Sequence, residues 1–144
     1  ALKNPDPEVR GRATKVLGQI GPSAVDAIPG LIQGLQDSGS DVRWKTAGAL
    51  GRMGKDAVPA LIQALQNPDP EVRLSTARVL GQIGEGAVDA IPALIQLLQD
   101  EDETVRGGVN TWTVSGIVVE ALEKIGTSEA LKVVAEQEKE ERLR

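Results

Sequence analysis

A single motif recurs along this chain at intervals of about thirty residues. Residues 5–10 read Pro-Asp-Pro-Glu-Val-Arg, and residues 68–73 repeat them without change. Successive Val-Arg pairs are separated by 33, 30 and 33 residues and begin at Val9, Val42, Val72 and Val105. Such a period is typical of proteins built from stacked repeats, in which each repeat buries its apolar face against the next one. The sequence therefore predicts an elongated stack that works by offering a surface.

Each repeat is predicted to contain two helices. The first helix begins at an N-cap, Asp6 or Asp69, whose carboxylate can accept a backbone N–H. Pro7 or Pro70 follows at the first helical position, where no hydrogen-bond donor is lost. Apolar residues then recur with helical spacing at Val9, Ala13, Val16, Leu17 and Ile20, and a similar stripe returns in the next two repeats. These helices are therefore expected to bury one face.

Glycines occupy two recurrent positions in the Val-Arg helices. One position follows the last turn, where a left-handed C-cap is expected, at Gly21, Gly54 and Gly84. The other lies inside the helix at Gly18, Gly51 and Gly81. Glycine costs about 1 kcal/mol relative to alanine in a helix interior, so its recurrence predicts that the neighbouring helix approaches closely there.

The second helix of each repeat carries a proline at a variable distance from the preceding glycine. Three more residues separate glycine from proline in the first and third repeats than in the second. We expect Pro29 and Pro92 to bend a longer helix, and Pro59 to lie in the first turn of a shorter one.

The pattern Leu-x-Asp-x-x-x-x-Val-Arg, followed by small and apolar residues and by Leu-Gly-x-Ile-Gly, resembles HEAT repeats of the short, phycobiliprotein-lyase type. The resemblance covers residues 2–126. It implies an all-α fold, a right-handed α-solenoid of stacked antiparallel helix pairs, with the Val-Arg helices on the concave side. Repeats of this type serve scaffolds, adaptors, a few bilin lyases and at least one class of DNA-repair enzyme, so the resemblance implies less about activity.

We interpret residues 1–144 as one solenoid domain. Its parts are a half repeat at 2–21, repeats at 22–54, 55–84 and 85–126, and a C-terminal capping helix at 127–144. The Val-Arg helix of the half repeat lacks a partner on one side, so we expect a piece of a longer array or an end that another chain covers. The fourth repeat contains an insertion near 107–115, where Gly107 and Gly108 predict a break and a new helix near Asn110 or Thr111.

The composition excludes several classes of function. The chain has no Cys, His, Tyr or Phe, so thiolate chemistry and the commonest proton shuttle are missing. The net charge of −5 argues against indiscriminate nucleic-acid binding. No apolar run reaches the roughly 18 residues that a membrane span needs, and no secretion signal is recognisable. We therefore expect a cytoplasmic protein that has no cofactor, no metal and no membrane contact.

Charge is distributed by helix type. The Val-Arg segments 6–20, 40–54 and 70–84 carry net charges of +1, +2 and +1, whereas the intervening segments 23–37, 55–67 and 85–100 carry −2, 0 and −3. Positions off the apolar stripe of the Val-Arg helices are expected to form one ridge on the concave side. The predicted partner-binding ridge comprises Arg12, Lys15, Trp44, Lys45, Arg52, Leu74 and Arg78, together with Trp112 from the insertion.

Each tryptophan allows two interpretations. An exposed Trp44 between Lys and Arg has the composition of a binding hot spot, because a flat ring buries area and the cations select acidic partners. The alternative is that Trp44 folds back as a lid over its neighbours. Insertions in solenoids tend to fall on a working face, which favours a binding role for Trp112. The alternative is that Trp112 fills the gap that the insertion opens.

A second set of arginines is interpreted as structural. Arg10, Arg43, Arg73 and Arg106 alternate with Asn4, Asp37, Asn67 and Asp100 at the ends of preceding helices. Contacts from these guanidinium groups to carboxylates, amides and helix-end carbonyls would fix the stacking as a ladder, and we favour this role over ligand binding. The acidic run 100–103 lacks the spacing of a calcium loop, so we do not interpret it as a metal site.

The sequence thus predicts a non-catalytic protein-interaction scaffold whose basic ridge binds an acidic or helical protein segment. One alternative, which the resemblance implies, is a subunit related to the phycobilin lyases, in which the cations would meet the propionates of a tetrapyrrole. The other is DNA binding by the same cations, for which a handful of basic side chains is a weak basis. Iron-dependent HEAT-like enzymes need His-Glu pairs, which this chain lacks. Self-association through the uncapped first helix is a further expectation.

Overall fold

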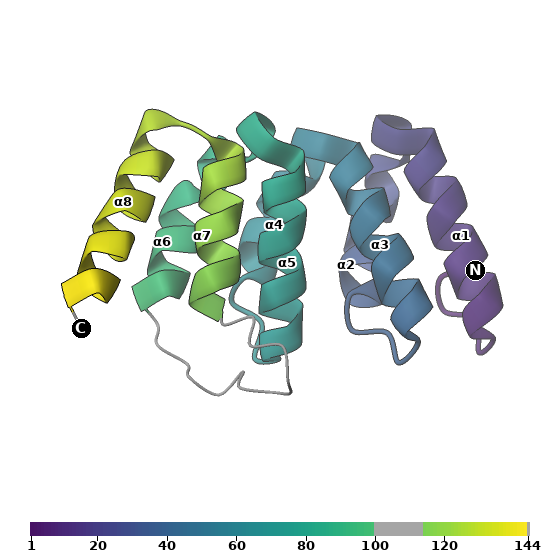
Figure 1. Ribbon diagram of the computed structural model, residues 1–144. Helices are drawn as coiled ribbons and strands as arrows, with labels where there is room; N and C mark the ends of the chain where they lie inside the picture. The colour runs from purple at the N-terminus through teal and green to yellow at the C-terminus, as the bar shows by residue number, and fades with distance from the viewer. Residues whose placement is uncertain (100–113, 144) are drawn as a thin grey trace.

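The computed structural model describes residues 1–99 and 114–143, which form a stack of helices (Figure 1). The α-helices of these residues are α1 (Pro7–Ile20), α2 (Ile28–Gly34), α3 (Ser40–Met53), α4 (Val58–Ala64), α5 (Pro70–Ile83), α6 (Ile91–Gln99), α7 (Val114–Ile125) and α8 (Ser128–Leu143). Three 3₁₀ segments connect the first three pairs, namely η1 (Gly21–Ala27), η2 (Gly54–Ala57) and η3 (Gly84–Ala90). The Val-Arg helices predicted within 6–20, 40–54 and 70–84 and the predicted last helix from Ser128 are confirmed. The predicted break at Gly107 and Gly108 and the predicted helix start near Asn110 or Thr111 lie outside the described residues.

The helices are arranged in two layers. Helices α1, α3, α5 and α7 lie side by side in one layer, and α2, α4 and α6 lie behind them in the other (Figure 1). The chain reverses direction at each 3₁₀ segment, so the two helices of a pair are antiparallel. Helix α8 lies at the C-terminal end and packs against α7. The protein is therefore an α-solenoid, as the repeats predict.

The beginnings of α1 and α5 follow from their sequences. The Asp6 carboxylate accepts the backbone N–H of Glu8 at 2.9 Å, and Asp69 accepts that of Glu71 at the same distance. Prolines occupy the first positions of both helices. The predicted N-caps are confirmed, and they satisfy donors that would otherwise lack a partner at the start of each helix.

The ends of the same helices differ in detail from the prediction. Gly21, Gly54 and Gly84 have positive φ values of 64°, 64° and 71°, as expected for C-caps. Their ψ values near −136° to −140° at Gly21 and Gly54 place them outside the left-handed helical region, in a conformation that only glycine adopts readily. The chain continues from this point into a 3₁₀ segment and does not turn away.

The prediction that Pro29 and Pro92 bend long helices is wrong. The segments that precede α2 and α6 are η1 and η3, and a non-helical residue, Ala24 or Ala87, interrupts each segment. Pro29 and Pro92 lie in the first turn of α2 and α6, where a missing N–H costs nothing. Pro59 lies in the first turn of α4, which confirms its predicted place. The three extra residues therefore lengthen the 3₁₀ segment.

The core lies between the two layers. Leucines contributed by both layers are fully buried there, including Leu31, Leu50, Leu61, Leu80, Leu94 and Leu122, each with 0% exposure. Each such side chain contributes on the order of 1.5–3 kcal/mol when it leaves water. This continuous core fixes which residues of the Val-Arg helices remain outside it.

Neighbouring Val-Arg helices approach each other closely at the interior glycines. A Cβ at Gly18 would lie 2.9 Å from the Ala49 Cα, and one at Gly81 would lie 3.0 Å from the Ala121 Cα. The predicted close approach is thus confirmed at these two positions, whereas at Gly51 the nearest atom is the side-chain Oε1 of Gln82, at 3.2 Å. Because this layer is brought together at backbone distance, we expect it to lie on the inner side of the curve.

Candidate partner-binding face

The solvent-facing surface of α3 carries an exposed aromatic ring, an open space over a glycine and a cation. Trp44 is 77% exposed, which contradicts the alternative that its ring folds back over neighbouring residues. Gly48 follows one turn later, and a Cβ placed there would meet no atom within 4 Å. Arg52 follows after one further turn and is exposed. The ring therefore stands beside open space, with a guanidinium group on the same side of the helix.

The repeat register places cations on both sides of this gap. Lys15 of α1 and Arg78 of α5 are the counterparts of Gly48 in the preceding and following repeats, and both are exposed. Helix α3 contacts both α1 and α5. Packed helices lie about 8–10 Å apart, so Lys15 and Arg78 stand roughly 20 Å from each other across Gly48. Gly48 therefore leaves an open space between the two cations. This can be inferred from the sequence only after the repeats are aligned.

Two further cations of the predicted ridge pair with carboxylates of their own helices. Arg12 pairs with Glu8 at 2.5 Å, and both side chains are about 70% exposed. Lys45 pairs with Asp41 at 2.6 Å. Exposed pairs one helical turn apart stabilise a helix by only a few tenths of a kcal/mol. A carboxylate from a partner can therefore replace Glu8 or Asp41 at little cost.

One predicted member of the ridge is misplaced. Leu74 is only 6% exposed and belongs to the hydrophobic core, so it cannot line a binding surface. The counterpart of Leu74 in α1 is Gly11, which faces Asp41 and Lys45 of α3. A side chain at this position of α1 would therefore point along the stack towards the following helix, α3. Trp112, Arg106 and Asp100 lie outside the described residues.

The structural arginines meet the turns between repeats. Arg10 donates from Nε to Asp37 Oδ2 at 2.6 Å and from Nη2 to Asp37 Oδ1 at 2.9 Å, which joins α1 to the turn between α2 and α3. Its Nη1 also donates to the carbonyl oxygens of Asn4 at 2.7 Å and Pro5 at 2.9 Å. Such a fork of charge-assisted bonds fixes orientation as well as distance.

The Arg10 contacts change the acidity of Asp37. The hydrogen bonds from Arg10 hold the pKa of the Asp37 carboxyl below its ordinary value; partial burial opposes this effect, and the Gly39 N–H adds to it. The carboxylate is therefore the form that the fold stabilises.

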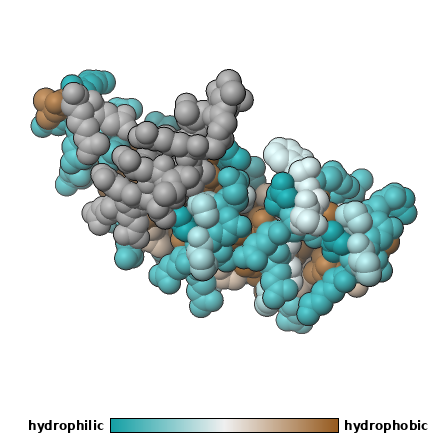
Figure 2. Space-filling model, turned by 90° about the horizontal axis from the view of Figure 1, so that it is seen from below, coloured by the Kyte–Doolittle hydropathy of each residue, from teal (hydrophilic) through white to brown (hydrophobic). Residues whose placement is uncertain are grey.

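The same arrangement recurs at the next two arginines. Arg43 Nη1 donates to the carbonyl oxygen of Asp37 at 2.6 Å, and Arg73 Nη1 donates to that of Asn67 at 2.8 Å. Each arginine thus reaches a carbonyl six residues before it in the chain. The turns into α3 and α5 lie on the underside of the stack (Figure 1). Seen from below, the part of this side that Figure 2 draws in colour carries mostly hydrophilic side chains, with smaller hydrophobic areas between them.

The described residues offer neither a metal site nor a membrane-spanning helix. No group of three or more metal-ligating residues gathers anywhere in 1–99 or 114–143. None of the helices in these ranges is long and apolar enough to cross a membrane.

The paired helices, the buried leucines and the charged outer face define the class of protein, an α-solenoid of antiparallel helix pairs. The chain belongs to the HEAT repeat family, because the family model of HEAT repeats matches residues 1–60, 28–111 and 58–144. No curated protein matched the chain.

Several solved structures are similar to this chain. A chain of the complex of CpcE and CpcF of phycocyanin lyase from Nostoc sp. PCC7120 matches with 32% identity and a TM-score of 0.62, over 92% of this chain and 53% of its own length. This chain therefore spans about half of that protein. An engineered protein matches with 25% identity and a TM-score of 0.50, over 94% of this chain and 64% of its own length. A designed armadillo repeat protein in complex with the peptide (KR)4 matches with 17% identity and a TM-score of 0.51, over 94% of this chain and 66% of its own length, and shows the fold alone.

Proposed function

We propose that this protein is a non-catalytic interaction scaffold that binds an acidic protein segment across α1, α3 and α5. The contacts come from Trp44 and from Lys15, Arg52 and Arg78, with Arg12 and Lys45 at the margin. The observation that carries the proposal is the 77% exposure of Trp44 beside the open space over Gly48. A large ring in water, surrounded by cations, is the usual composition of a binding hot spot.

The geometry supports a segment that runs across the helices. Its backbone would pass over Gly48, where no side chain stands in the way. An apolar side chain would cover the Trp44 ring, and carboxylates on either side would reach Lys15 and Arg78. Cations of this kind raise the association rate and select acidic partners, whereas the ring supplies most of the affinity.

The fluorescence of Trp44 offers a direct test. The chain contains two Trp residues, so Trp112→Phe leaves Trp44 as the single indole. The probe is a synthetic peptide of alternating Glu and Leu, added at low salt. We expect a blue shift of the emission as the ring leaves water, and Arg78→Glu should weaken binding about tenfold by replacing attraction with repulsion. Lys132→Glu on α8 makes the same charge change far from the face and should have no effect.

Two outcomes would refute the proposal. One is an unchanged emission with the acidic peptide at every concentration. The other is equal weakening by Arg78→Glu and Lys132→Glu, which would mean that net charge alone attracts the peptide. With a partner in hand, a pull-down with Trp44→Ala and Arg78→Glu combined should lose that partner.

A second candidate function rests on the 32% identity to a chain of the phycocyanin lyase complex. In this role the chain would be one subunit of a bilin-handling assembly, and the same cations would hold the propionates of a tetrapyrrole. Without His, Tyr or Cys, its own proton transfers would fall to Asp, Glu or Lys. Added bilin whose absorbance does not change with the protein present would eliminate this candidate.

A further inference from the structure

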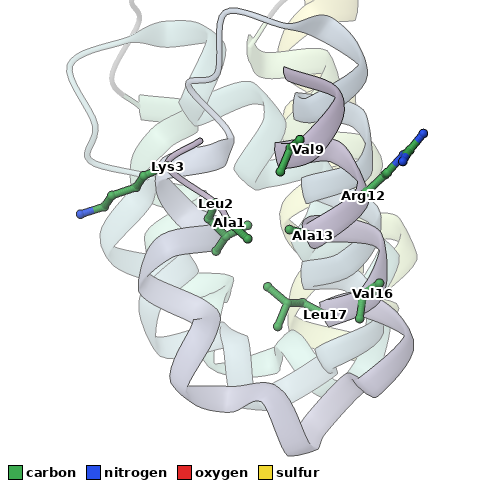
Figure 3. A pocket seen from close by; sticks show the side chains of 8 residues that line it. All are labelled: Ala1, Leu2, Lys3, Val9, Arg12, Ala13, Val16 and Leu17. Atoms are coloured by element: carbon green, nitrogen blue, oxygen red, sulfur yellow. The ribbon is translucent and has the colours of Figure 1, made fainter. Parts of the chain in front are cut away.

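Two cations approach the same part of the surface where α1 packs against α3. Arg12 points away from Leu17, which faces the apolar side of α1 (Figure 3). Lys15 follows one turn later on the same side of the helix as Arg12 and is exposed. Arg52 of α3 reaches back over α1, since its Nη1 is 3.6 Å from the Cβ position of Gly18, one turn beyond Lys15. We call Lys15 and Arg52 the first cation pair.

The same arrangement recurs where α5 packs against α7. Arg78 and Gly81 of α5 occupy the register positions of Lys15 and Gly18. The Cδ of Lys124 in α7 lies 3.5 Å from the Cβ position of Gly81. Arg78 and Lys124 are both exposed and form the second cation pair. Lys124 is absent from the ridge that the sequence predicts, because the longer fourth repeat obscures the register of α7.

The corresponding positions between α3 and α5 are uncharged. Gly48 stands in place of the first cation. Gln82 stands in place of the second, with its Oε1 3.2 Å from the Cβ position of Gly51. Trp44, one turn before Gly48, is 77% exposed. Along the stack the face is therefore basic, then neutral and aromatic, then basic again.

The separation of the two cation pairs sets the spacing of the groups that can reach both. The pairs are two repeats apart, which is roughly 20 Å at 8–10 Å for each packed helix. An extended chain advances about 3.3 Å per residue, so carboxylates about six residues apart span this distance. One bound segment can thus contact both pairs at once.

The alternation of side chains in an extended segment matches the place of Trp44. Residues an even number apart point to the same side of an extended chain, and residues an odd number apart point to opposite sides. Two carboxylates six residues apart therefore share one side, and the residue midway between them points to the other. On α3, Trp44 lies one turn before Gly48 and Arg52 lies one turn after it. A segment that crosses over Gly48 can direct its carboxylates towards the side of Arg52 and its middle residue onto the ring.

We infer that the partner segment binds in an extended conformation and carries two carboxylates six residues apart, with an apolar residue midway between them. This inference rests on the proposed scaffold function and specifies the ligand of the same face as Glu-x-x-Leu-x-x-Glu or its equivalent with Asp or another aliphatic residue. One carboxylate meets each cation pair, and the apolar side chain covers Trp44. Lys124 pairs with Glu120 at 3.0 Å, but the two side chains are 52% and 44% exposed. Such a pair is weak, so a ligand carboxylate can replace Glu120.

Two peptides of identical composition, both blocked at their ends, test the spacing. Glu-Ser-Ser-Leu-Ser-Ser-Glu carries its carboxylates six residues apart, and Glu-Ser-Ser-Leu-Ser-Glu-Ser carries them five apart. Seven residues in a helix would span only about 10 Å, so the first peptide can reach both cation pairs only when it is extended. Dissociation constants are measured at low salt from the Trp44 emission of the Trp112→Phe protein. We expect the first peptide to bind about tenfold more tightly, because the five-residue spacing points its second carboxylate to the wrong side.

Lys124→Gln tests the second cation pair separately. Glutamine is tolerated at this register position, since α5 has Gln82 there. The variant should bind both peptides equally, because only one cation pair remains complete. Lys132→Gln on α8 removes the same charge from another exposed position and should keep the tenfold preference.

The outcomes separate this inference from the scaffold function. Equal binding of the two peptides by the wild type, no binding of the six-residue spacing, or a preference that survives Lys124→Gln overturns the inference. Each of these results leaves the scaffold function standing if the peptide of alternating Glu and Leu still shifts the Trp44 emission. An alternating peptide that leaves the emission unchanged refutes the scaffold function itself.

Discussion

The close approach of α1 to α3 predicts opposite effects for two Gly→Ala substitutions. Gly18 and Gly48 both lie inside α-helices, so alanine at either position gains about 1 kcal/mol from helix propensity. At Gly48 the new methyl group meets no atom within 4 Å. At Gly18 it would lie 2.9 Å from the Cα and 3.0 Å from the Cβ of Ala49, so one backbone must move away from the other.

The difference between the two variants isolates the packing contribution. Overfilling a packed interface typically costs about 1–3 kcal/mol, and the propensity gain is common to both substitutions. Gly48→Ala should therefore be about 1 kcal/mol more stable than the wild type. Gly18→Ala should be about 1–3 kcal/mol less stable than Gly48→Ala. Gly51→Ala is an intermediate control, because its methyl group meets the Oε1 of Gln82 at 3.2 Å, and that side chain can move.

Urea unfolding followed by far-UV circular dichroism measures these differences, and amide hydrogen exchange locates them. We expect faster exchange in α1 of the Gly18→Ala protein, because Gly18 is one of the three residues, with Gly11 and Thr14, that are buried in this helix. If the Gly18→Ala protein is as stable as the Gly48→Ala protein and exchanges no faster in α1, the reasoning from backbone contact is refuted.

Three further substitutions test the caps and the ladder. Gly54→Ala should cost about 1–3 kcal/mol in urea unfolding purely through its positive φ, since no atom lies within 4 Å of the new Cβ. Asp69→Ala should cost about 1 kcal/mol in the same assay by removing the N-cap of α5, and Asp69→Ser should recover most of it. Because the pKa of Asp37 is lowered in the folded state, its contribution to stability is fully present above the ordinary carboxyl pKa of about 4 and is lost as the pH falls through the lower folded value. Asp37→Asn should therefore be less stable than the wild type at neutral pH, and acid titration of unfolding should bring the two proteins together; a constant gap across the titration would contradict the role of the Asp37 charge.

The repeat period and the local signals were sufficient to predict most of the fold. N-caps at Asp6 and Asp69, positive φ at Gly21 and close contact at Gly18 are each set by a few neighbouring residues or by the demands of one backbone conformation. Features of this kind can be inferred from one sequence because alternatives to them are costly.

The features that escaped prediction depend on relations between repeats. Leu74 and Trp44 share a register position, yet Leu74 is 6% exposed and Trp44 is 77% exposed. The apolar stripe of one helix does not determine how much of each side chain the next helix buries. The predictions for Pro29 and Pro92 were wrong for a similar reason. A proline near the start of a helix and one that bends its interior have the same sequence signature until the preceding segment is known to be 3₁₀.

The packing glycines also position the cations of the candidate binding face. A Cβ at Gly11 would lie 3.3 Å from the Nζ of Lys45, and one at Gly18 would lie 3.6 Å from the Nη1 of Arg52. These two cations of α3 thus extend over α1 at points where α1 has no side chain. The same residue type that brings the helices together leaves room for a long side chain to lie across the interface. A substitution such as Gly11→Leu should therefore displace Lys45 and weaken the binding of the acidic peptide, even though position 11 itself touches no partner. If that variant binds the acidic peptide as the wild type does, the packing of this layer does not control its binding of acidic ligands.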